Sequence, residues 1–310
     1  MVNLKVGVTA RGWGAATARD PKQALEAGRR AEAANLDGIH TGDHVTFYGK
    51  GTDGLLTLAA IAAVTERIEL KTSVYLLPLR HPSPVALQAA QLDQLSGGRL
   101  IFGVGVGGED PKEFEACGVD LHTRGARTNE AIQIIRLLWS RDHVTFEGDH
   151  YQLRDISMNP KPTRPVPIHI GGRSTAALDR AGRLADGYTG IWLSLDRFRS
   201  AAETIATAAT EAGRDASAVE LGLQIWTSVD DNRGAARARV AAAMKDVYRI
   251  PFDRFERYTP YGSAQEIADH LAPYVELGAR HFSLIPVQAT LEETIERAAE
   301  IRSALLTLQP

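Results

Sequence analysis

The sequence of 310 residues lacks several features that mark special classes of protein. Its single cysteine, Cys117, excludes a disulfide framework within the chain and suits a reducing compartment. No apolar run reaches the ~18 residues that a membrane-spanning helix needs. The N-terminus enters a strand-like pattern without the apolar core of a signal peptide. We therefore expect a cytoplasmic protein with no membrane partner.

An excess of positive charge is also missing. The chain has 35 Lys and Arg residues against 38 Asp and Glu residues, a formal net charge of -3. Domains that bind nucleic acid are usually basic, so nucleic acid is not an expected partner. Hydrophobic residues make up 44% and charged residues 24% of the chain, which is typical of a globular protein with ample core. A small-molecule substrate is the expected partner.

Strand-like and helix-like patterns alternate along the whole chain. Short apolar runs bounded by turn residues predict strands, and the stretches between them have helical spacing. Eight such units in about 300 residues favour a closed α/β barrel, a (β/α)8 or TIM barrel, over an open sheet. No linker divides residues 1–310, so we expect one barrel domain. The predicted strands are 4–9, 37–42, 68–77, 100–106, 167–171, 187–192, 220–229 and 281–286.

Two insertions interrupt this alternation. Residues 143–159, which follow strand 4 and its helix, have the pattern of a β-hairpin. Residues 235–261, which follow strand 7, are helical and rich in arginine. Acidic residues partly balance these arginines, so a solvated helix face is one interpretation and a basic rim for an anionic ligand is the other.

The end of strand 4 carries a run of glycines. Glycines at this end remove side chains where ligands bind to parallel α/β folds, so we interpret the stretch as the floor of a ligand site. The run also fits the dinucleotide motif G-x-G-x-x-G. However, no acid closes a following strand at the required distance, which disfavours a dinucleotide site. The glycines are at positions 103, 105, 107 and 108.

His44, just after predicted strand 2, is the best single catalytic candidate. Histidine exchanges protons at working pH, and Asp43 beside it lies at the same strand end. A histidine that only hydrogen-bonds a loop is the alternative. His40 is four residues away, but on a strand this spacing does not bring two imidazoles to one face. We therefore expect no metal site.

Strand 5 ends in Gly171-Gly172-Arg173-Ser174 and leads into a helix. Free backbone N–H groups, the helix dipole and an arginine together favour a phosphate there. Simple capping of the helix by Ser174 or Thr175 is the alternative. Aromatic residues near other strand ends indicate either a partly aromatic pocket or core packing, and these are Trp13, Tyr75, Trp192 and Trp226.

Several motifs together resemble the bacterial-luciferase-like superfamily of flavin- and deazaflavin-dependent oxidoreductases. The resemblance spans nearly the whole chain. The matching segments are Arg80-His81-Pro82-Ser83-Pro84, Leu95-Ser96-Gly97-Gly98-Arg99, Gly103-Val104-Gly105-Val106-Gly107, Glu113-Phe114-Glu115-Ala116, Pro167-Ile168-His169-Ile170-Gly171-Gly172 and Tyr261-Gly262-Ser263-Ala264-Gln265-Glu266.

The resemblance implies a (β/α)8 barrel that holds an isoalloxazine-type ring across its strand ends. It places a non-prolyl cis peptide at Ser73-Val74, the acid/base at His44 and a second proton donor at Glu109. The implied catalytic residues are His44, Asp43 and Glu109. The expected substrate-binding residues are Arg11, Trp13 and Trp192. The expected cofactor-binding residues are Asp43, Ser73, Val74, Tyr75, Gly105, Val106, Gly107, Gly108, Gly171, Gly172, Arg173 and Ser174.

The Asp43-His44 pair resembles the branch of the superfamily that uses F420. The primary hypothesis is an F420-dependent oxidoreductase that transfers hydride between the deazaflavin and a small organic substrate. The resemblance also suggests that the arginine-rich insert suits the oligoglutamate tail of F420, and it allows a homodimer. The main alternative is an FMN-dependent monooxygenase fed by a separate flavin reductase. A cofactor binder without turnover and an unrelated phosphate-handling barrel are further alternatives.

Overall fold

The computed structural model describes residues 3–10 and 22–308. Within these ranges, eight parallel strands form a closed barrel, because β10 pairs with β7 as well as with β11. The predicted (β/α)8 barrel is confirmed. In the order of pairing the strands are β7 (Leu100–Gly105), β10 (Ile168–Gly171), β11 (Gly187–Ile191), β12 (Glu220–Val229), β14 (Ala279–Pro286), β1 (Lys5–Thr9), β2 (Gly38–Thr41) and β5 (Glu69–Thr72).

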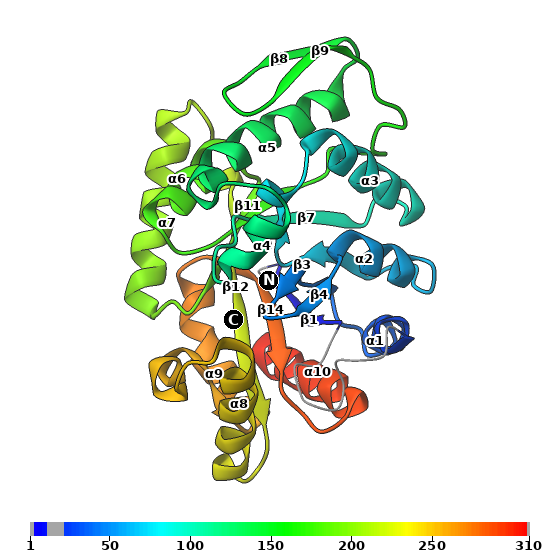
Figure 1. Ribbon diagram of the computed structural model, residues 1–310. Helices are drawn as coiled ribbons and strands as arrows, with labels where there is room; N and C mark the ends of the chain where they lie inside the picture. The colour runs from blue at the N-terminus through cyan, green and yellow to red at the C-terminus, as the bar shows by residue number, and fades with distance from the viewer. Residues whose placement is uncertain (1–2, 11–21, 309–310) are drawn as a thin grey trace.

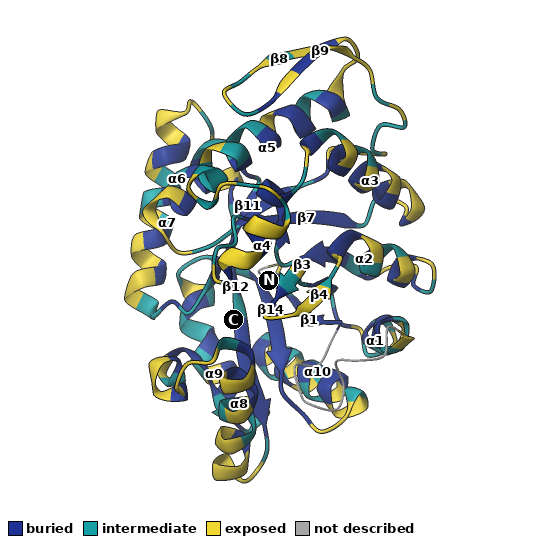
Figure 2. Ribbon diagram, viewed as in Figure 1, coloured by how far each residue is buried: buried dark blue, intermediate teal, exposed yellow. Residues whose placement is uncertain are grey.

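Helices surround the barrel, and Figure 1 shows them as an outer ring. Their faces toward the strands are buried and their outer faces are exposed (Figure 2). In the part of the chain described, no helix combines the length and apolar character that crossing a bilayer requires. The ring consists of α1 (Lys22–Ala33), α2 (Gly54–Ala62), α3 (Pro82–Leu95), α5 (Arg124–Ser140), α6 (Thr175–Leu184), α7 (Leu195–Glu211), α9 (Ala264–Glu276) and α10 (Leu291–Thr307).

Both predicted insertions are present. The first is the antiparallel hairpin of β8 (Val144–Glu147) and β9 (Gln152–Ile156), which lies outside α5 (Figure 1). The second contains α8 (Arg233–Tyr248), two short turns, η4 (Phe252–Arg254) and η5 (Glu256–Tyr258), and the short strand β13 (Tyr261–Gly262).

Three short elements differ from the sequence prediction. The third predicted strand forms two strands, β5 and β6 (Tyr75–Leu76). The peptide bond between Ser73 and Val74 is cis, which confirms the expected non-prolyl cis peptide. The loop after β2 forms a hairpin of β3 (His44–Phe47) and β4 (Lys50–Thr52). The loop after β7 forms α4 (Pro111–Ala116).

The β3–β4 hairpin and the second insertion share a hydrophobic core that is separate from the main one. We call it the mouth cluster, because it lies at the carboxyl ends of β12 and β14. Phe47 of the hairpin packs there with residues of α8 and of the barrel strands. Its buried members are Phe47, Trp226, Val240, Ala243, Met244, Val247, Phe252, Phe255, Ile285 and Val287. The loops around the mouth are therefore held by apolar burial as well as by the barrel.

The barrel interior contains large polar side chains. Lys71 is 1% exposed, and its Nζ lies 2.9 Å from Oγ1 of Thr189 and 3.3 Å from Nδ1 of His169. Glycines on neighbouring strands make room for the imidazoles. A Cβ at Gly187, for example, would lie 2.6 Å from the ring of His169. Burial lowers the pKa of Lys71 to about 8, although nearby glutamates raise it.

Candidate active site

His44 and Glu113 form the central contact of the site. Nδ1 of His44 lies 3.0 Å from Oε2 of Glu113, whose side chain is buried. A carboxylate can only accept, so Nδ1 carries the proton and Nε2 of the neutral ring is left as an acceptor. Within the residues described, no hydrogen bond engages Nε2, and the side chain of His44 is 24% exposed. This arrangement is that of a general base held by a carboxylate.

Glu113 also holds the backbone of the hairpin that carries His44. Its Oε1 accepts from the N–H groups of Val45 (2.8 Å) and Thr46 (3.2 Å). Burial raises the pKa of Glu113, but the hydrogen bond of His44, the positive charge of its ring when protonated and these N–H groups lower it, and the net value lies below the usual one. Glu113 is therefore ionised at neutral pH.

Asp110 ties the same two loops together at a second point. Its Oδ2 accepts from the backbone N–H of Tyr48, 2.8 Å away, at the turn of the hairpin. Its Oδ1 accepts from Lys112 N and so caps α4. Two carboxylates from the loop after β7 thus fix the loop after β2. The ring of His44 in turn packs against Phe47, at 4.5 Å between centroids.

Asp43 is 1% exposed and fully engaged. Its carboxylate forms a two-pronged pair with Arg80, at 2.6 and 3.0 Å, and accepts from the N–H groups of Gly54 and Leu76. Burial alone would lower the pKa of Arg80, and the charge of Asp43 raises it above its usual value. In this geometry Asp43 positions the strand end beside His44. A direct contact of Asp43 with a cofactor stays a prediction.

The segment between β5 and β6 explains several of the glycines. The side chain of Val74 lies against Gly171, where a Cβ would come within 2.5 Å of it, and an added Cβ at Gly105 would collide with it. A Cβ at Gly103 would collide with the carbonyl of Thr72. Protein atoms thus fill the space that a side chain would take at positions 103 and 105, and the contact of Gly105 with a cofactor stays a prediction. Val106, Gly107 and Gly108 are partly exposed, so their role stays a prediction.

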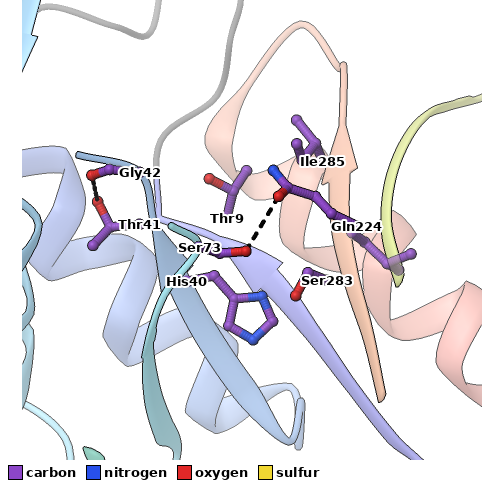
Figure 3. Close-up of a pocket in the computed structure, with 9 residues that line it drawn as sticks. Thr9, His40, Thr41, Gly42, Ser73, Gln224, Ser283 and Ile285 are labelled. Carbon is purple, nitrogen blue, oxygen red and sulfur yellow. Dashed lines mark hydrogen bonds between the residues drawn. The ribbon is translucent and has the colours of Figure 1, made fainter. Parts of the chain in front are cut away.

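Beside Ser73 lies a small cavity of about 30 Å³ (Figure 3). Ser73 donates to Oε1 of Gln224 across it, at 3.2 Å. Nδ1 of His40 and Oγ of Ser283 are buried there without a hydrogen-bond partner in the described chain. The volume suits about one water molecule and is far too small for a flavin ring. A ring would have to lie above Ser73, toward the mouth.

The loop after β10 has the features predicted for an anion site. Gly172 has a φ of +134°, which favours glycine. Ser174 caps α6 by accepting from Ala177 N, so the capping interpretation of Ser174 is correct. Arg173 is exposed, and in the described ranges its guanidinium has no carboxylate partner. It stacks over the ring of Trp192, 5.1 Å from the ring centroid.

The remaining predicted residues have different surroundings. Trp192 has a φ of 53° and packs against Tyr248 and Phe255 of the second insertion. Tyr75 is buried, with Arg80 over its ring, and so belongs to the core. Glu109 is exposed and its role stays a prediction. Arg11 and Trp13 lie outside the described residues.

His40 and His44 do not converge, since His40 points into the barrel and His44 contacts Glu113. In the described ranges, one set of side chains has metal-ligand chemistry: His169, Glu220 and His281, with ligand atoms within 4.8 Å of one another. The ammonium group of Lys71 contacts His169, and a divalent cation would have to lie beside this positive charge. We therefore assign no metal to this set.

Sequence reasoning missed Glu113 as a site residue. It was noted only as part of a family motif, and its partner His44 is 69 residues away in the sequence. The motif itself could have identified Glu113, because it contains a carboxylate that follows the glycine run closely in the sequence.

Comparisons with known proteins identify the family of the chain. The family model described as luciferase-like monooxygenase matches residues 4–258. An F420-dependent glucose-6-phosphate dehydrogenase of Amycolatopsis mediterranei is 29% identical, over 90% of this chain and 91% of its own. The enzyme of the same name from Beutenbergia cavernae is 31% identical, over 87% and 89%.

Among solved structures, an F420-dependent secondary alcohol dehydrogenase in complex with an F420-acetone adduct has a TM-score of 0.86. It is 22% identical, over 98% of this chain and 99% of that one. This likeness concerns the fold. The match of the family model over residues 4–258 leads to one conclusion: the chain belongs to the luciferase-like monooxygenase family.

Proposed function

We propose that this protein is an F420-dependent oxidoreductase that interconverts an alcohol and a carbonyl compound. The observation that carries the proposal is the contact of His44 with Glu113 at the barrel mouth. Relatives named as F420-dependent dehydrogenases match most of the chain and support the choice of cofactor.

The residues around the mouth fit such a cofactor. The loop after β10 offers a glycine with positive φ, the N-terminus of α6 and the guanidinium of Arg173, which has no carboxylate partner in the described ranges. This combination is suited to a phosphate. Bound F420 would supply the hydride acceptor or donor.

The chain itself would supply the proton chemistry. Oxidation of an alcohol removes a hydride from carbon and a proton from the hydroxyl group. Nε2 of His44 is the acceptor available for that proton, because Glu113 keeps the other proton on Nδ1. The negative charge of Glu113 then stabilises the imidazolium that forms. In the reverse direction His44 returns the proton to the carbonyl oxygen.

A titration of the purified protein with F420 and, separately, with FMN tests the cofactor. Binding of F420 at micromolar or lower concentration, with weak binding of FMN, is the expected result. A screen of alcohols and ketones, followed by the absorbance of F420, then tests the reaction. Preferential FMN binding with product formation that needs oxygen would overturn the proposal in favour of the monooxygenase. Binding of neither cofactor would also overturn it.

A further inference from the structure

Strand β2 has an aspartate–arginine pair next to each of its ends. At the amino end, Asp37 pairs with Arg302 through two contacts, of 2.7 and 2.9 Å. At the carboxyl end, Asp43 pairs with Arg80 in the same two-pronged way, at 2.6 and 3.0 Å. Asp43 lies directly before His44 in the sequence, so the second pair adjoins the candidate acid/base and the first lies at the opposite end of the strand.

Protein groups occupy the whole carboxylate of Asp43. Its Oδ1 accepts from the backbone N–H of Gly54 at 3.1 Å, and its Oδ2 accepts from that of Leu76 at 3.1 Å. Each oxygen also accepts one N–H of the Arg80 guanidinium. An ionised carboxylate offers about four lone-pair sites, and these four donors use them. A cofactor could therefore bind this carboxylate only by displacing one of the four.

The pair connects three elements at the carboxyl end of β2. Gly54 is the first residue of α2, and Leu76 belongs to β6, which follows the cis peptide. The guanidinium of Arg80 also lies over the ring of Tyr75 in β6, 4.4 Å from the ring centroid. The pair thus joins the strand end that leads to His44 with the segment that follows the cis peptide.

Burial makes this carboxylate dependent on its arginine. The side chain of Asp43 is 0% exposed and that of Arg80 is 22% exposed. Burial raises the pKa of Asp43, the charge of Arg80 and the two backbone N–H groups lower it, and the net value stays above the usual one. Asp53 lies 3.9 Å from the same guanidinium, and Tyr75 and Cys117 also face the pair. Without the positive charge of Arg80, the buried carboxylate would take up a proton more readily.

We propose that Arg80 is a positioning residue for the reaction, because it fixes the carboxylate of Asp43 between β2, α2 and β6. The inference rests on the oxidoreductase function proposed above. It assigns Asp43 to the protein frame in place of the cofactor contact that the resemblance implies. Through Asp43, Arg80 sets the peptide that leads to His44, and through its contact with Tyr75 it sets the segment beside the expected ring site. A displacement of about 1 Å at such groups can lower a rate by about 10²-fold.

Arg80→Ala and the matched change Arg302→Ala test this role. Arg80→Ala should lower kcat by about 10- to 100-fold and weaken F420 binding, whereas Arg302→Ala should lower only the free energy of unfolding. Because Arg80 is partly exposed, guanidinium ions at concentrations too low to unfold the protein should restore part of the lost turnover. Sodium chloride at the same ionic strength should not. Arg80→Lys keeps the charge without the two-pronged geometry, so its kcat should lie between those of Arg80→Ala and the parent protein. It replaces Arg80→Ala in these measurements if that variant does not fold.

A measurement without cofactor separates this inference from the proposed function. Carbon NMR of the Asp43 carboxyl group should show that it titrates about 1–3 pH units higher in Arg80→Ala than in the parent protein. Arg302→Ala should leave this titration unchanged. The NMR result does not depend on which cofactor binds, so it tests the pair even if the F420 titration fails. An unchanged titration of Asp43 in Arg80→Ala, or an equal loss of turnover in Arg80→Ala and Arg302→Ala, would overturn the inference.

Discussion

One carboxylate, that of Glu113, holds both the ring and the backbone beside it: Oε2 lies 3.0 Å from Nδ1 of His44, and Oε1 lies 2.8 Å from the N of Val45. A catalytic imidazole works only in the right tautomer and orientation, and here one buried group sets both. The first two predictions concern this pair.

Replacing His44 by Ala should lower kcat by about 10²- to 10⁴-fold, the usual contribution of a general acid or base. The affinity for F420, measured by fluorescence titration, should stay within about twofold, because proton transfer and not cofactor binding is lost. His122→Ala is the matched control, since His122 is exposed on another loop. Full turnover by His44→Ala would refute the assigned role.

Replacing Glu113 by Gln should lower kcat by at least about tenfold with little change in KM, as for other carboxylate–histidine pairs. Nitrogen NMR of the imidazole should show Nδ1 protonated in the parent protein and a mixture of tautomers in the variant. A purely structural role would leave the tautomer unchanged. Glu115→Gln, exposed on the same helix, is the control.

The contact between Val74 and the glycine strands leads to a third prediction. Gly105→Ala should lower the free energy of unfolding by about 1–3 kcal/mol, because a Cβ there collides with Val74. In the Val74→Ala background the same change should cost about 1 kcal/mol less. Denaturant unfolding measures both. Gly42→Ala, where a Cβ meets nothing within 4 Å, should cost less. If the effects of Gly105→Ala and Val74→Ala on the free energy of unfolding are additive, the predicted collision is contradicted.

The buried Lys71 gives a prediction about pH. Its pKa is lowered to about 8 in the folded protein, against 10.5 in the unfolded chain. Between these values the unfolded chain binds more protons, so this group makes folding more favourable as pH rises, by at most about 1.4 kcal/mol per pH unit. Below about pH 8 the full free-energy cost of burying the charged ammonium group is present. Lys71→Met removes the group and should lose this dependence.

Denaturant unfolding of Lys71→Met and the parent protein at several pH values measures the difference. The variant should be most stabilised relative to the parent near pH 7, and this advantage should shrink toward pH 10.5. For Lys50→Met, a change at an exposed side chain, the free energy of unfolding should vary with pH as it does for the parent. Parallel curves for Lys71→Met as well would show that the pKa of Lys71 is not lowered in the barrel.

The regular part of the fold could be predicted from the sequence because its signals are local. The bounds of β12 match the predicted range 220–229. The hairpin of β3 and β4 and the short α4 were missed, because contacts between distant loops stabilise them: Glu113 and Asp110 accept from hairpin N–H groups. The spacing of hydrophobic residues within the hairpin or α4 does not indicate such contacts.

The candidate site was predictable in part. His44 and the loop at Gly171 and Gly172 follow from their places at strand ends, which the barrel topology brings together. The pairing of His44 with Glu113 is a long-range contact that a single sequence does not reveal. The glycines were over-interpreted for the same reason: a glycine can make room for a ligand or for Val74, and the sequence does not distinguish them.

The mouth cluster has a consequence for exchanging parts between related barrels. Phe47 of the hairpin and Met244 of α8 are buried in one apolar core, although they belong to loops after different strands. Grafting the second insertion alone would leave Phe47 uncovered or force it against a foreign surface. The hairpin and the insertion should therefore be exchanged together. Chimeras that exchange only one of them should lose solubility before they gain a new specificity.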